Sequence, residues 1–194
     1  MFIRVKKVKK RNGKTYEYAH LVSGIWKRKQ LKNFETGRKF VKYNNSKHLY
    51  SKFLGRAYKF PKSEKNIQLE EFVGGFQKFV ENEEINNIYK KLLEFELAIR
   101  GFANNENVWM KDGVFLDLNR LIVHDGKSDA VIKLKEVSGY LCYNTLQDLF
   151  KINKIENKYE GIYLMKKLKS IGISLSPEHF FILADRLLKE NAYN

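Results

Sequence analysis

The sequence predicts an α+β protein, with a basic, β-rich N-terminal module followed by a mainly helical body that contains a small antiparallel sheet. Residues 1–62 contain 19 Lys and Arg residues and two acidic residues, a formal charge of +17, whereas residues 63–194 contain 18 basic and 20 acidic residues, a formal charge of −2. The module opens with two segments rich in β-branched and aromatic residues, and the body opens with apolar residues at helical spacing. These observations divide the chain into residues 1–62 and 63–194.

Residues 2–26 are predicted to form a β-hairpin. Asn12-Gly13 is the dipeptide that type I′ turns prefer, because both central positions of that turn need positive φ. A two-residue loop at this point pairs Lys9 with Tyr16 and Lys7 with Tyr18. The predicted register therefore places tyrosines and these lysines on the same face near the tip.

The rest of the module is predicted to contain a third strand over residues 38–43, a helix over residues 47–54 and a last strand over residues 56–60. The helix is expected because Asn44-Asn45-Ser46 offers an N-cap and Gly55 offers a C-terminal stop. Pro61-Lys62-Ser63 is the expected linker to the body.

A folded module with this charge is typical of proteins that bind nucleic acid. We expect its cations to contact phosphates and its tyrosines to position or stack on bases. The predicted binding residues are Lys6, Lys7, Lys9, Lys10, Arg11, Lys14, Tyr16, Tyr18, Lys27, Arg28, Lys29, Arg38, Lys39 and Lys42. The alternative is that the lysine–tyrosine pairs only keep an edge of the sheet soluble.

The module resembles the N-terminal segment of DDE-class insertion-sequence transposases of archaea and bacteria. The resemblance is carried by residues 2–18, which read FIRVKKVKKRNGKTYEY, by Leu21-Val22, and by the sequence FLGR at residues 53–56. It implies a nucleic-acid-binding N-terminal module of an archaeal mobile element. The catalytic domain of that family is too large for the remaining residues, so the resemblance implies no catalytic residue here.

The body begins with two predicted helices. Apolar residues from Leu69 to Val80 recur every three or four positions, which predicts one helix that runs through Gly74-Gly75. Residues 85–99 are apolar over more than half of the helix surface, which predicts a second helix at the centre of the body.

Two hairpins and three helices are expected after residue 107. Asp112-Gly113 and Asp125-Gly126 separate short apolar segments, which predicts hairpins over residues 108–116 and 121–134 and hence one small antiparallel sheet. The helices are predicted over residues 145–152, capped by Asn144, over residues 159–170, and from Ser176-Pro177 onwards.

The main enzymatic alternative is a metal-dependent nuclease of the restriction-endonuclease type. Such a site needs a helix carboxylate, a strand aspartate and an acid-x-Lys motif to hold Mg²⁺ and activate water. The candidates are Glu94 or Glu96, Asp117, and Lys133 or Lys135. The motif fails because Val131 and Lys133 occupy the positions two residues before the candidate lysines. The sequence therefore assigns no catalytic residue.

The other polar residues predict no cofactor and no metal. The four histidines and Cys142 lack the paired spacing of a zinc site. A single cysteine allows no internal disulfide, which favours the cytoplasm. No apolar run reaches the roughly 20 residues that a membrane helix needs, so no membrane partner is expected.

The sequence therefore predicts a non-catalytic nucleic-acid-binding protein. The resemblance favours DNA. The tyrosines and the lack of a recognisable helix-turn-helix leave an RNA-binding or ribosome-associated factor as the alternative. Residues 63–194 are expected to supply a homodimer interface or a docking surface for a protein partner.

Overall fold

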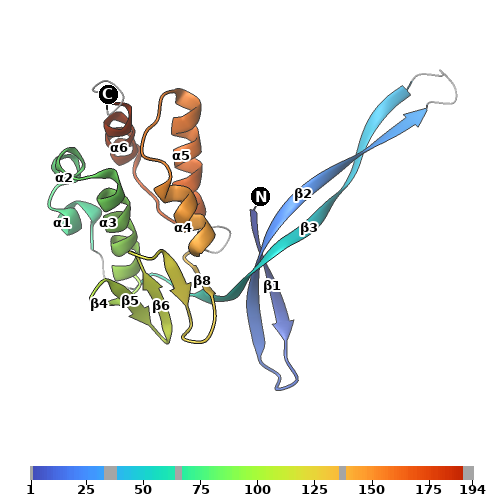
Figure 1. Cartoon of the computed structure of the whole chain (residues 1–194), viewed down its shortest axis with the longest axis horizontal. Coiled ribbons are helices and arrows are strands. Elements are labelled where there is room, and N and C mark those ends of the chain that lie inside the picture. Colours follow the sequence, from blue (N-terminus) through green and yellow to red (C-terminus); the bar gives the residue numbers. More distant parts are fainter. Residues whose placement is uncertain (1, 33–38, 64–66, 136–138, 190–194) are drawn as a thin grey trace. The chain divides into compact units, whose positions relative to one another are not determined.

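Figure 1 shows a computed structural model of the chain, which describes residues 2–32, 39–63, 67–135 and 139–189. Side chains are described for all of these except residues 24–32, 39–51 and 189. The chain forms two compact units, Met1–Arg56 (unit 1) and Ala57–Asn194 (unit 2). Helices and antiparallel strands occupy mostly separate stretches of sequence, which confirms the α+β class.

Unit 1 is built from three long antiparallel strands. They are β1 (Phe2–Lys9), β2 (Thr15–Lys32) and β3 (Lys39–Lys59), which continues into unit 2. The sheet has the order β1-β2-β3-β8-β9, with its last two strands in unit 2. The predicted N-terminal hairpin is confirmed.

The register of that hairpin differs from the prediction by one residue. Lys9 pairs with Thr15, so the loop is Arg11-Asn12-Gly13, closed by a 2.9 Å hydrogen bond from the Lys10 amide to the Lys14 carbonyl. Only Gly13 has positive φ, at +76°, whereas a type I′ turn needs two such residues. The geometry is that of a three-residue loop, and every cross-strand pair of the prediction was therefore wrong.

The predicted helix over residues 47–54 was also wrong, because β3 runs through this segment as a continuous strand. Tyr50 and Phe53 are aromatic residues that suit a strand, and pairing with the long β2 satisfies the backbone along the segment. An isolated eight-residue helix gains too little from local caps to compete with that pairing. Gly55, expected to stop a helix, lies inside the strand with φ +108°.

The expected linker is part of unit 2. Phe60 is buried and its ring meets Phe102 edge-on with centroids 4.7 Å apart. Ser63 donates through its amide and its hydroxyl to the Ile99 carbonyl, at 2.8 and 2.9 Å. Phe60 and Ser63 are therefore attached to unit 2, whereas Pro61 and Lys62 between them are exposed.

The first helices of unit 2 are α1 (Leu69–Val73), α2 (Phe76–Asn82) and α3 (Ile85–Ala98). The single helix predicted over residues 69–80 was wrong, because Gly74 and Gly75 have φ of +72° and +98° and end α1 before α2 begins. Left-handed backbone of this kind is freely available only to glycine. The predicted helix over residues 85–99 is confirmed as α3.

The strands of unit 2 belong to two sheets, whereas the sequence predicted one. The four-stranded sheet has the order β4-β5-β6-β7, and its strands are β4 (Ala103–Asn105), β5 (Val108–Lys111), β6 (Val114–Asp117) and β7 (Ile122–His124). The predicted hairpin at Asp112-Gly113 is confirmed, since both residues have positive φ and Lys111 pairs with Val114.

The second predicted hairpin was wrong in its pairing. Strand β8 (Ala130–Lys133) pairs with β9 (Tyr140–Leu141) in the other sheet, and only an isolated bridge between His124 and Asp129 joins it to β7. The Asp125 carboxylate accepts hydrogen bonds from the amides of Lys127 and Ser128 at 3.1 and 3.0 Å. This Asx turn redirects the chain out of the first sheet.

The chain ends in α4 (Tyr143–Phe150), α5 (Lys158–Ile171) and α6 (Pro177–Lys189). The cap of α4 is Cys142 rather than the predicted Asn144, because the Thr145 hydroxyl accepts from the Cys142 amide at 3.1 Å. Ser176 caps α6 as predicted, since its hydroxyl accepts from the His179 amide at 3.1 Å.

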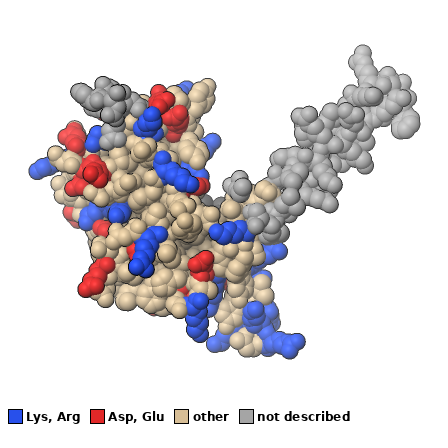
Figure 2. Space-filling model, viewed as in Figure 1, with Lys and Arg blue, Asp and Glu red and all other residues tan. Residues whose placement is uncertain are grey.

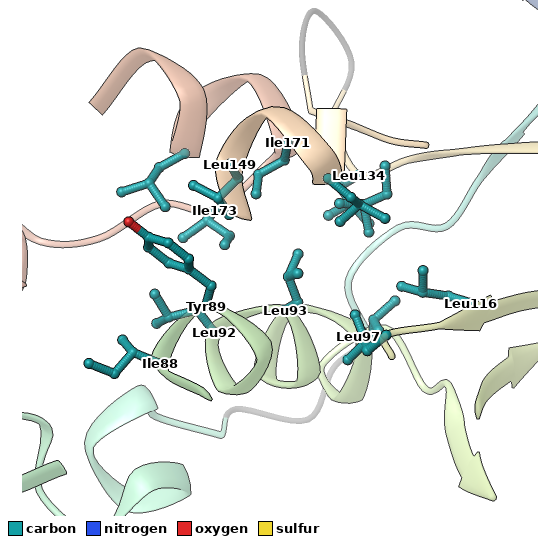
Figure 3. Packing of buried hydrophobic residues seen from close by; sticks show 14 of the residues in the cluster. Ile88, Tyr89, Leu92, Leu93, Leu97, Leu116, Leu134, Leu149, Ile171 and Ile173 are labelled. Carbon is teal, nitrogen blue, oxygen red and sulfur yellow. The ribbon is translucent and has the colours of Figure 1, made fainter. Parts of the chain in front are cut away.

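Helix α3 lies at the centre of the hydrophobic core, as its sequence predicts. Figure 3 shows Leu93 and Leu97 of α3 directed toward a layer that includes Leu134, Leu149 and Ile171. Leu93 and Leu97 are fully buried. One helix therefore packs against α4, α5 and the residue that follows β8, and burial of its apolar surface stabilises this arrangement.

A buried ion pair lies at the end of α3. Arg100 is only 1% exposed, and its guanidinium Nη1 donates to the Glu96 carboxylate at 2.5 Å and to the Glu96 carbonyl at 2.6 Å. Its Nη2 donates to the Leu134 carbonyl at 3.1 Å. Lys111 of β5 donates to the Arg100 carbonyl at 2.5 Å. This residue therefore joins α3 to the ends of strands from both sheets.

Glu70 joins the short helices α1 and α2 to α6. Its carboxylate accepts from the Phe76 amide at 2.7 Å and lies 2.7 Å from His179 Nε2. The His179 ring also lies against Phe76, with ring centroids 4.4 Å apart. The hydrogen bond from Phe76, followed by that from His179, lowers the pKa of Glu70 below its usual value.

The Arg100→Met variant is expected to lower the free energy of unfolding by about 3–5 kcal/mol, because it leaves the Glu96 carboxylate buried without its partner. Chemical denaturation followed by circular dichroism measures this change. The double variant Glu96→Leu/Arg100→Met is the control, and it should recover part of the loss because it removes both charges. A loss below about 1 kcal/mol in the single variant contradicts the assigned role.

The Glu70→Gln variant is expected to flatten the acid side of the stability profile. The folded-state pKa of Glu70 lies below its unfolded value, so the stabilisation is present above the unfolded value and is lost as pH falls through the folded value. Melting temperatures of the wild type should therefore fall more steeply than those of the variant as the pH is lowered through and below about 4.3, the usual pKa of a glutamate. The neighbouring substitution Glu71→Gln should keep the wild-type slope. Equal slopes for all three proteins would count against the contact.

Candidate nucleic-acid interface

The observed register determines which side chains share a face of the hairpin. Pairing of Lys6 with Tyr18 and of Val8 with Tyr16 places even-numbered residues of both strands on one face. We call the cluster formed on this face by Tyr16, Tyr18, His20, Phe53 and Arg56 the aromatic face. The cations that alternate into the same face from β1 and the loop are Arg4, Lys6, Lys10 and Lys14.

Lys7 and Lys9 do not lie beside the tyrosines, although the predicted register placed them there. Lys7 pairs with Glu17 on the opposite face, where its Nζ lies 3.7 Å from the carboxylate. Lys9 pairs with Thr15. Both lysines remain exposed, so they keep the ability to contact phosphate, but from the other side of the ribbon.

Two cations lie over the tyrosine rings. The Arg56 guanidinium is 4.4 Å from the centroid of Tyr16, and the Lys10 ammonium is 5.5 Å from the centroid of Tyr18. These distances are within the range of cation–π attraction. The contacts orient long, otherwise mobile side chains over an aromatic surface.

Phe53 completes the aromatic face from β3. Its ring centroid lies 5.3 Å from that of His20 and 6.1 Å from that of Tyr18. Burial, followed by the positive charge of Lys6, lowers the pKa of His20 below its usual value. This shift favours the neutral imidazole, which lies as a further ring beside Tyr18 and Phe53.

Gly55 explains how Phe53 and Arg56 reach the same face. Residues three apart on a regular strand point to opposite faces, because side chains alternate with a period of two. Gly55 has φ +108°, and Leu54 next to it is buried while Phe53 is exposed. We interpret this irregular residue as a bulge, because the ring contacts place Arg56 on the face that holds Phe53.

The sequence missed Phe53, Arg56 and His20 as site residues. Phe53 was expected on a helix, and the other two were not singled out as binding residues. A signal was present, because an isolated glycine between an aromatic residue and a cation in a strand is typical of a bulge.

The remaining predicted binding residues are placed as follows. Arg11 lies in the exposed loop at the hairpin tip. Lys27, Arg28 and Lys29 belong to β2, and Lys39 and Lys42 belong to β3, but their side chains are not described. Arg38 lies outside the described residues. In Figure 2 blue Lys and Arg side chains gather toward the end of the β1–β2 hairpin, whereas the visible face of unit 2 mixes blue with red.

The residues weighed for a nuclease lie on separate elements of unit 2, although Glu96 attracts Lys135 electrostatically. Asp117 ends β6 and accepts from the amides of Asn119 and Arg120 at 2.8 and 3.0 Å, as a turn residue does. Lys133 belongs to β8 of the other sheet, and Glu96 is held by Arg100. Within the described parts of the chain, no group of three or more His, Cys, Asp or Glu side chains could hold a metal ion.

The Cys142 thiol is buried at the start of α4. None of the helices in the described ranges has the length and apolar character required to cross a bilayer.

Comparison with protein-family models, curated proteins and solved structures finds no match to this chain.

The Gly55→Ala variant is expected to displace Arg56 from Tyr16, because a side chain at φ +108° is strained and the strand relaxes toward regular alternation. The ring current of Tyr16 shifts the Arg56 δ-methylene protons, and NMR should show that this shift disappears. Gly161→Ala is the control, because Gly161 lies in α5 with open space around its Cα and without positive φ. An unchanged Arg56 shift in Gly55→Ala contradicts the bulge.

Proposed function

We propose that this protein binds DNA, without catalysis, through unit 1. The observation that carries the proposal is the concentration of exposed cations on a folded hairpin. The exposed cations are Lys6, Lys7, Lys9, Lys10, Arg11 and Lys14, and Glu17 is the one acidic residue of residues 1–34. A two-stranded ribbon of this kind fits a major groove, and its lysines reach the flanking phosphates.

The charge of unit 1 supports an electrostatic mode of binding. Phosphate contacts release condensed counterions, so they supply affinity without sequence specificity and make it strongly dependent on salt. The ribbon presents cations on both faces, since Lys6 and Lys10 alternate with Lys7 and Lys9. Two phosphate backbones on either side of a groove can therefore be contacted at once.

The resemblance of residues 2–18 and 53–56 to transposase N-terminal segments supports DNA as the ligand and a mobile-element origin. The bulge at Gly55 gives the FLGR sequence a structural role in unit 1. RNA is the second candidate, because the aromatic face offers rings on which the unpaired bases of folded RNA can stack.

Unit 2 is proposed to mediate self-association or to dock a protein partner in the cytoplasm. Phe181 of α6 is 70% exposed and Tyr159 of α5 is 80% exposed. A second copy of the chain or a protein partner would cover these exposed side chains and bury their apolar surface.

The affinity of the full-length protein for duplex DNA is expected to fall steeply with salt. About six phosphate contacts predict a slope of log K against log salt of roughly −5. Fluorescence anisotropy with a labelled duplex, titrated between roughly 50 and 200 mM salt, measures the slope. The triple variant Lys6→Gln/Lys10→Gln/Lys14→Gln should reduce its magnitude by about 0.9 for each phosphate that the protein no longer neutralises.

The matched control is Lys78→Gln/Lys127→Gln/Lys158→Gln, which removes the same charge from exposed positions of unit 2. It should leave the slope close to that of the wild type. A flat salt response, or equal effects of the two triple variants, is incompatible with binding through the hairpin. Tighter binding to a structured RNA than to the duplex would favour the second candidate.

A further inference from the structure

We infer that the aromatic face binds an unpaired nucleotide of DNA, with the base stacked on Phe53 and a neighbouring phosphate held by Arg56. This inference rests on the proposed function and adds the substrate class, a single-stranded segment. It joins the FLGR sequence of residues 53–56 to a defined surface of unit 1.

The first observation is the exposure of Phe53. Its side chain is 57% exposed, although it belongs to a strand that also contributes the buried Leu54. A phenyl ring at the surface does not contribute the favourable free energy that its burial would add to folding. Phe53 lies in one cluster with the Tyr18 and His20 rings, and grouped apolar surface of this kind is typical of a contact surface.

The second observation is that the described neighbours of Phe53 hold its ring without stacking flat against it. Tyr18 and His20 are tilted by 41° and 57° relative to the Phe53 ring. Tilted rings support the edge of Phe53 and fix its orientation. A flat partner such as a nucleobase would make a stacked contact that these neighbours do not.

The third observation is the position of the charge. Arg56 lies over Tyr16 on the same face, because the bulge at Gly55 places it there. Lys6 pairs with Tyr18, and Arg4 pairs with His20. A base stacked on Phe53 would thus lie beside Arg56 of β3 and near the cations of β1. These positive charges complement the negative charge of the adjoining phosphates.

These features favour an unpaired nucleotide over a duplex. In a duplex both faces of each base are covered by stacking, so an aromatic side chain on a strand has no free base face to contact. Proteins that bind single strands combine aromatic platforms with cations along the backbone, and the aromatic face has both. Stacking and phosphate pairing require no 2′-hydroxyl, so the surface is satisfied by DNA, the ligand proposed above.

The test compares the Phe53→Leu and Phe53→Tyr variants of the full-length protein. Leucine keeps an apolar side chain and removes the ring, whereas tyrosine keeps the ring. Anisotropy with a labelled oligo-dT of roughly 15 nucleotides and with a duplex measures both affinities. Phe53→Leu should weaken oligo-dT binding by about five-fold to a hundred-fold and change duplex binding by less than about two-fold. Phe53→Tyr should bind oligo-dT within about two-fold of the wild type.

A second measurement does not depend on affinity. Fluorescence of 2-aminopurine placed within the oligonucleotide should be quenched on binding to the wild type and to Phe53→Tyr, and less so on binding to Phe53→Leu. Circular dichroism and the duplex salt slope verify that Phe53→Leu remains folded, since that slope depends on the lysines.

Each contrary outcome has its own meaning. Unchanged oligo-dT binding by Phe53→Leu, or equal losses on oligo-dT and duplex, overturns the stacking site, while duplex binding by the wild type still supports the proposed function. Tighter binding of oligo-rU than of oligo-dT overturns the assignment to DNA. Absence of binding to every nucleic acid refutes the proposed function itself.

Discussion

The arrangement of unit 2 depends on one buried guanidinium. Arg100 closes α3, neutralises Glu96 one turn earlier and reaches the backbone of Leu134 just beyond β8, while its own carbonyl accepts from Lys111 of β5. Apolar packing alone tolerates sliding of a helix over a sheet, because dispersion contacts have little directionality. A planar donor held by three acceptors on Glu96 and Leu134 tolerates much less, because an incorrectly placed guanidinium would be charged, buried and unpaired. The large hydrophobic surface of α3 therefore supplies the free energy, and Arg100 restricts the geometry in which that free energy is obtained.

Unit 1 is stabilised in a different way from unit 2. Its described hydrophobic residues that are fully or nearly fully buried are Ala19, Val22 and Leu54, so it has little core, and its integrity comes from the ladders of three long strands. Like charges crowded on such a ribbon repel one another, and a bound polyanion would relieve that repulsion. The exposed Phe53 and the closely spaced lysines destabilise the free protein. Their presence is consistent with a structure selected for its ligand. Few residues of unit 1 therefore both pack in its core and belong to the proposed binding surface, although the two kinds of residue alternate along the same strands.

The sequence anticipated elements whose signals are local and missed those determined by pairing partners. Asp112-Gly113, the apolar face of α3 and the Ser176-Pro177 start all act within a few residues, and each was predicted correctly. The Asn12-Gly13 loop was located but assigned one residue too short, which shifted every pair of the hairpin. Residues 47–54 satisfy local helix rules, yet β2 offers a longer ladder. Gly74-Gly75 had been accepted within a helix because the apolar spacing continued across it, whereas the backbone uses both glycines at positive φ. At the candidate interface the cations of the hairpin were identified from composition, but Phe53 and Arg56 depend on a bulge that spacing alone does not reveal.

The odd length of the loop at the hairpin tip has a consequence for how this chain can vary. Tyr16 and Tyr18 are held in place by Arg56 and Phe53 from the neighbouring strand, so a change in the loop is transmitted to β1. Insertion or deletion of one residue there would shift the alternation of β1 by one position. The residues beside the rings would then be Ile3, Val5, Lys7 and Lys9 instead of Arg4, Lys6, Val8 and Lys10. A change of two residues would leave the combination of rings and cations intact. Whether the loop has an odd or an even number of residues therefore matters more to the interface than which residues it contains. Related sequences can change the loop residues and keep the interface, provided that the number stays odd.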